Sequence, residues 1–130
     1  MDMKDDAAVK AVGAYGGGIA SSGNVCGTLL GGIAMISSIY SRANLEEQED
    51  PRIWALSNTF MKEFEKLTES FGGINCRDIA RVDWKDRDAV KAYYKDPDSN
   101  RKACIQVVGD AAYALGALLD LEAEEKKEKS

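Results

Sequence analysis

Histidine is absent from the 130 residues, and the chain has only two prolines and three cysteines. The lack of histidine excludes Ser-His-Asp and Cys-His catalytic pairs and histidine-rich metal sites. Any metal would have to bind to cysteine, carboxylate or backbone oxygen. Basic residues are outnumbered, with 17 Lys and Arg against 22 Asp and Glu and a net charge of -5. No basic excess is available to follow a phosphate backbone, so we expect no nucleic-acid partner.

Long hydrophobic runs are also scarce. Residues 11–41 carry no charge, but the most apolar part of this segment contains three glycines, Gly27, Gly31 and Gly32. That part is shorter than the ~20 residues of a membrane-spanning helix. The N-terminal sequence MDMKDD has no apolar segment of the secretory type. Three cysteines are too few for a disulfide-rich secreted scaffold. We therefore expect a cytoplasmic protein that does not insert into a membrane.

The apolar pattern is helical, with glycines between the segments, and no run of period two stands out. Helices are expected at residues 5–15, 25–42, 51–71, 89–94 and 100–124, with a helical turn at 76–80. The serines and the asparagine of residues 21–24 are expected to cap the second helix. The sequence predicts an all-α, single-domain helical bundle of four to five helices over residues 1–124, followed by a frayed charged tail at 125–130.

Two helices have a predicted inner face. In the third helix the apolar residues recur at three- and four-residue steps: Ile53, Phe60, Phe64, Leu67 and Phe71. In the last helix the same rule selects Ile105, Val108, Ala112, Leu115 and Leu119.

The three cysteines share a local setting. Cys26, Cys76 and Cys104 each lie at the start of a predicted helix. Free backbone N–H groups at a helix N-terminus stabilise a thiolate and lower the thiol pKa from about 8.5. Such thiolates bind thiophilic metals or attack disulfides, although buried cysteine is also a common inert packing residue. No C-x-x-C is present, so neither a thioredoxin motif nor a zinc ribbon is indicated.

A glycine-rich turn precedes Cys26. Residues 16–18 are all glycine, and Ser21, Ser22 and Gly23 follow. Such a segment can form a nest of backbone N–H groups that binds anions. The Lys-Ser/Thr ending of a P-loop is missing, which favours a structural turn.

The blocks around the cysteines resemble the C_GCAxxG_C_C family of redox-active proteins. The similar blocks are AYGGGI at 14–19, VCGTLLGG at 25–32, FGGINCRDI at 71–79 and CIQVV at 104–108. A similar domain occurs in split-Soret cytochromes, where its cysteines are associated with an iron–sulfur cluster. The resemblance implies that Cys26, Cys76 and Cys104 are the redox or metal-binding residues, and that a cluster or another thiolate-bound metal is the cofactor.

The chain departs from the family pattern in two ways. Thr28 stands where the motif has alanine, and this leaves Cys26 in place. The pattern also begins with a further cysteine upstream, which this chain lacks. A four-thiolate site, the usual set for a cluster, therefore cannot be assembled from one copy.

These observations favour a redox or metal-binding helical protein with an electron-transfer partner protein. The alternative is a structural or oligomerisation module with inert cysteines, and no reaction or enzyme class is assigned. The uncharged residues 11–41 also suggest a homodimer, since so small a core cannot easily cover them.

Overall fold

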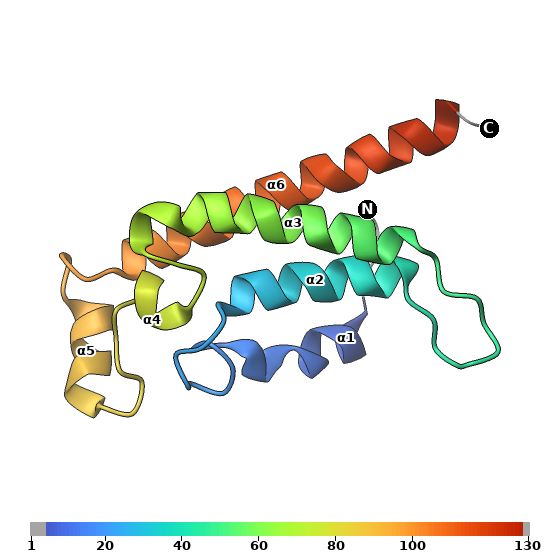
Figure 1. Ribbon diagram of the computed structural model, residues 1–130. Helices are drawn as coiled ribbons and strands as arrows, with labels where there is room; N and C mark the ends of the chain where they lie inside the picture. Colours follow the sequence, from blue (N-terminus) through green and yellow to red (C-terminus); the bar gives the residue numbers. More distant parts are fainter. Residues whose placement is uncertain (1–4, 129–130) are drawn as a thin grey trace.

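The computed structural model describes residues 5–128, with side chains described as far as residue 125, and its regular elements are helices (Figure 1). The α-helices are α1 (Asp6–Ala11), α2 (Gly27–Tyr40), α3 (Arg52–Thr68), α4 (Cys76–Ile79), α5 (Arg87–Lys95) and α6 (Arg101–Glu128). Single 3-10 turns, η1 (Gly13–Tyr15) and η2 (Glu69–Phe71), follow α1 and α3. Residues 5–128 contain no strand, so the all-α prediction is confirmed.

The core lies where α2, α3 and α6 pack together. α3 contributes the face that its period predicted: Ile53, Phe60 and Phe64 are buried and Leu67 is partly buried. α3 ends at Thr68 rather than at the predicted residue 71, and Phe71 packs against the core from η2. Figure 1 shows α2 and α3 running side by side. Gly32 of α2 lies beneath the Phe60 ring, where an added Cβ would overlap the ring atoms. The absence of a side chain at Gly32 therefore sets how closely these two helices approach.

The predicted inner face of α6 is wrong in part. Ile105 and Val108 are 61% and 52% exposed, and Ala112 is exposed as well. Val107 and Ala111 are buried in their place, while Leu119 is buried as expected. The apolar residues of α6 occur all around its circumference, so their spacing does not identify one inner face. α6 also runs to Glu128, beyond the predicted end at residue 124, and residues 129–130 lie outside the described part.

α6 is also the helix that could cross a membrane by length and composition alone. Among the described residues the qualifying stretch is Arg101–Glu125, and 17% of an apolar 18-residue window within it is buried. The uncharged segment at residues 11–41 contributes instead a shorter apolar helix, α2, of 14 residues. α6 did not stand out in the sequence as an apolar segment, because its scattered acidic residues break the apolar run.

Candidate cysteine redox site

The three cysteines lie at helix N-termini, as predicted. Cys26 is the N-cap residue of α2, and Cys76 is the first residue of α4. Cys104 lies in the first turn of α6, where its N–H donates to the Asn100 carbonyl. All three are free thiols; Cys76 is buried, and Cys26 and Cys104 are partly buried.

A short antiparallel bridge brings the first two cysteines together. Val25 pairs with Asn75. The Cys26 N–H donates to the Ile74 carbonyl at 3.0 Å, and the Cys76 N–H donates to the Asn24 carbonyl at 2.6 Å. Because alternate residues point to opposite faces, Cys26 and Cys76 share the face that Val25 and Asn75 do not use. They are diagonal neighbours there, a relation in which residues of paired strands are usually about 7–8 Å apart.

The glycine-rich turn before Cys26 makes this bridge possible. Five consecutive residues, 17–21, have positive φ between 51° and 70°, and three of them are not glycine. Left-handed backbone costs a non-glycine residue roughly 1–2 kcal/mol. Gly18 cannot be replaced by a residue with a side chain, because an added Cβ would lie 2.6 Å from the Cβ of Cys76. The strained turn thus carries residues 24–26 directly onto α4.

The same turn does not form an open anion nest. The N–H groups of residues 19–24 all donate to carbonyls of residues 14–19. The expectation of a structural turn is therefore confirmed for this segment. The expectation that residues 21–24 cap α2 is wrong, since Cys26 is the N-cap and has no side-chain cap bond.

Aromatic side chains surround the sulfurs of Cys76 and Cys104. The Trp84 indole Nε1 donates to the Cys76 Sγ at 3.3 Å. Tyr93 is buried, and its side chain is hydrogen-bonded to Cys104. The two rings meet edge to face with centroids 5.1 Å apart. Cys76, Ala80 and Tyr93 form a small apolar cluster, against which Trp84 and Cys104 pack.

Burial decides the ionisation of these two thiols. It raises the pKa of Cys76 and Cys104 above the ordinary thiol value, and it outweighs the hydrogen bonds from Trp84 and Tyr93, which lower the pKa. The expectation of thiolates with lowered pKa is therefore wrong for Cys76 and Cys104. A helix N-terminus lowers a thiol pKa only when the sulfur keeps enough contact with water or charge.

The thiols are close enough to influence one another electrostatically. The charge of Cys76 raises the pKa of Cys104 more than the charge of Cys26 does. The charge of Cys26 likewise raises the pKa of Cys76. The described side chains contain no group of three or more Cys, Asp or Glu that could hold a metal ion. The cysteines are thus neighbours without forming a ready set of metal ligands.

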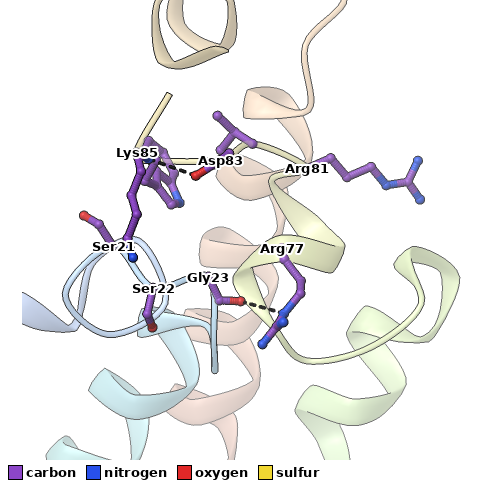
Figure 2. Close-up of a pocket in the computed structure, with 9 residues that line it drawn as sticks. Ser21, Ser22, Gly23, Arg77, Arg81, Asp83 and Lys85 are labelled. Carbon is purple, nitrogen blue, oxygen red and sulfur yellow. Dashed lines mark hydrogen bonds between the residues drawn. The ribbon is translucent and has the colours of Figure 1, made fainter. Parts of the chain in front are cut away.

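Trp84 also lines a pocket of about 400 Å³. Its lining includes the charged residues Arg77, Arg81, Lys85 and Asp83 and the hydroxyls of Ser21 and Ser22. Figure 2 shows Lys85 extending toward the two serines, while Arg81 extends away from them. Arg77 is held in place, since its guanidinium donates to the Gly23 carbonyl and to Asn24 Oδ1. The pocket has a positive excess on an acidic protein.

Two parts of this site escaped the sequence prediction. Neither Trp84 nor Tyr93 was assigned a role from the sequence, yet the Trp84 indole donates to the Cys76 sulfur and Tyr93 packs in the same cluster. The pairing of residues 24–26 with residues 74–76 left no strand pattern to detect. Only the repeat of Asn shortly before Cys26 and Cys76 hinted that the two segments are alike.

Comparison with known proteins gives one match. The model of a family described as "Putative redox-active protein (C_GCAxxG_C_C)" matches residues 1–118. Neither the curated proteins nor the solved structures contain a significant match.

Proposed function

The chain belongs to the C_GCAxxG_C_C family, whose model covers residues 1–118, and we propose that it is a thiol–disulfide redox protein. The observation that carries the proposal is the convergence of Cys26, Cys76 and Cys104 at one end of the bundle. They come from three different helices, and their charges act on one another. Scattered packing cysteines would show no such coupling.

Cys76 and Cys104 are the pair that we expect to form the disulfide. Cys104 packs against the small apolar cluster that contains Cys76, and of the two other cysteines Cys76 affects its pKa more. Cys26 and Cys76 are diagonal neighbours, a relation in which residues of paired strands are usually about 7–8 Å apart. A disulfide prefers a shorter Cα separation, so a Cys26–Cys76 bond requires the bridge to move.

The reaction is an exchange with a low-molecular-weight disulfide. One protein thiolate attacks a sulfur of that disulfide, forms a mixed disulfide and releases one small thiolate. The second protein thiolate then attacks the mixed disulfide and releases the other small thiolate. The two released thiolates take up the two protons that the cysteines lose. The cysteines lose two electrons, and the small disulfide gains them.

The hydrogen bonds at the sulfurs influence how readily the thiols ionise, and thereby the rate of this exchange. The Trp84 N–H and the Tyr93 hydroxyl oppose the effect of burial on the thiol pKa, because each stabilises a thiolate. The basic pocket behind Trp84 offers a place for the carboxylates of the small disulfide. Glutathione disulfide, with more carboxylates than amines, is a suitable probe of that class.

The family resemblance also implies an iron–sulfur cluster or another thiolate-bound metal. The residues of one chain do not fit that group as they stand, because no set of three ligands exists among the described side chains. A cluster usually takes four cysteines, and the chain has three. We also propose a relation to split-Soret cytochromes, an electron-transfer partner protein and a cytoplasmic location. No step of the reaction is assigned to a metal.

The test is a count of free thiols in native protein after incubation with glutathione disulfide, with peptide mapping of the product. We expect two thiols to disappear and a Cys76–Cys104 peptide pair to form. Cys26→Ser should retain this product, whereas Cys76→Ser and Cys104→Ser should stop at a mixed disulfide. Three thiols that stay free in native protein and react only in urea would establish inert packing. Iron, zinc and sulfide analysis of anaerobic protein tests the metal use separately, and stoichiometric iron and sulfide would overturn the thiol-exchange proposal.

A further inference from the structure

α6 is the longest helix of the molecule, and most of it is uncovered. Within Arg101–Glu125, 17% of an apolar 18-residue window is buried. Large apolar side chains along it are exposed to solvent: Ile105 is 61% exposed, Val108 is 52% exposed and Tyr113 is 80% exposed. A small protein that leaves so much apolar helix uncovered usually has a partner for it.

These residues align on one side. At 100° per residue, Ile105, Gly109, Ala112 and Gly116 fall within a narrow sector, with Val108 and Tyr113 at its edges. We call these six residues the α6 stripe. They are all exposed, and the open sides of Gly109 and Gly116 have no atom within 4 Å of an added Cβ. Val107 and Ala111 point the other way, into the core. The stripe therefore presents bare backbone that another helix could approach closely.

The charges beside the stripe identify the partner. Arg101 and Lys102 are exposed at its N-terminal end, and Asp120, Glu124 and Glu125 are exposed at its C-terminal end. A second α6 running antiparallel places the basic end of each helix beside the acidic end of the other. It also sets the two helix dipoles in opposite directions, which is favourable. A surface that complements its own copy in this way matches the self-complementary contact of a twofold dimer.

We propose that the chain forms a homodimer in which the α6 stripes of two copies pack antiparallel, with the twofold axis near Ala112. In this arrangement Gly109 of one copy faces Gly116 of the other. A membrane surface is the competing occupant, but Asp120 is exposed in the same sector of the helix as the stripe and would enter the hydrocarbon. Within residues 11–41, which were expected to drive association, α2 is mostly buried or partly buried, whereas most of residues 11–24 are exposed.

The first experiment is sedimentation of the full chain at micromolar concentration, with Ala112→Arg as the disrupting variant. We expect a mass of twice 14.1 kDa for the parent and of one chain for the variant, with equal helical circular dichroism. Ala55→Arg, on an exposed position of α3, is the matched control and should remain dimeric. A parent mass equal to one chain, or a dimer untouched by Ala112→Arg, would overturn the proposal.

The second experiment tests orientation by oxidative cross-linking under conditions in which the parent chain gives no cross-link. Ala112→Cys near the axis should form a dimer through its own disulfide, while Ile105→Cys should not, because the two copies of residue 105 lie far apart. Efficient cross-linking at both positions would indicate parallel helices. Binding of the parent, but not of Ala112→Arg, to sedimenting phospholipid vesicles would assign the stripe to a membrane and also overturn the dimer.

Discussion

α3 and α6 are both long helices, and they differ in what their apolar residues do. α3 buries Ile53, Phe60 and Phe64 on one face and leaves its charged residues on the other. α6 spreads apolar residues around its circumference and keeps Ile105 and Tyr113 in water. α3 therefore commits one continuous apolar face to the core, although Trp54 remains 61% exposed, whereas α6 commits only part of its apolar residues. Apolar content alone does not report how much a helix contributes to the core.

The largest expected effect tests this difference by truncation. Phe64 is fully buried in α3, and Leu121 of α6 is 55% exposed and lies outside the stripe. Phe64→Ala should lower the free energy of unfolding by about 3–5 kcal/mol through lost burial and a residual cavity. Leu121→Ala should change it by no more than about 0.5 kcal/mol. Urea unfolding measures both, and similar losses would show that α6 is as tightly packed as α3.

The next effect uses two adjacent glycines of α2. An added Cβ at Gly32 meets the Phe60 ring, whereas one at Gly31 meets nothing within 4 Å. Gly32→Ala should therefore destabilise the protein by about 1–3 kcal/mol through overpacking. Gly31→Ala should stabilise it by up to about 1 kcal/mol, because alanine favours the helix. Thermal unfolding of the pair gives opposite signs if the α2–α3 contact is as close as described.

The sequence predicted α3 better than α6 for a physical reason. Lys62, Glu63 and Glu65 mark the outer face of α3, so its spacing identifies the inner one. α6 has few charges in its middle, and Ile105 and Val108 were assigned to the wrong side. The cysteines were placed at helix starts from neighbouring residues alone. Their convergence depends on pairing between segments about fifty positions apart, and local pattern carries no information about it.

A third effect compares two positions of α6 itself. Cys104 is partly buried beside Tyr93, and burial raises its pKa, while Gln106 two residues later is exposed. A cysteine introduced by Gln106→Cys should react with iodoacetamide at pH 7 at least about tenfold faster than Cys104, because more of it is thiolate. Peptide mass spectrometry of partially alkylated protein separates the sites. Equal rates would show that the first turn of α6 is open to solvent.

The same pKa shifts set a pH dependence of stability. For Cys76 and Cys104 the folded-state pKa is raised, so the unfolded chain loses these protons first as pH rises. Stability should be unaffected below the ordinary thiol pKa of about 8.5 and should fall above it. Replacing both cysteines by alanine should flatten the decline between about pH 8.5 and 9.5. A parent curve that rises across this range would contradict the buried thiols.

The smallest effect concerns the charge of the surface pocket. Lys85→Glu reverses a cation that extends toward Ser21 and Ser22. It should slow oxidation by glutathione disulfide about two- to fivefold at low salt and leave oxidation by uncharged hydroxyethyl disulfide unchanged. Lys62→Glu, which lies on the outer face of α3, is the matched control. Equal slowing with both disulfides would assign Lys85 a structural role.

The bridge between Val25 and Asn75 also holds the strained turn against Cys76. It closes a loop of 50 residues (75 − 25), which makes it a contact of high sequence separation and a late one to form during folding. We expect opening of this pairing to separate the strained turn from Cys76 and to expose that side of the residue, while Trp84 and Tyr93 remain packed against it. Access to the sulfurs is then governed by a local unfolding equilibrium. Hydrogen exchange at the amides of Cys26 and Cys76 would report its free energy.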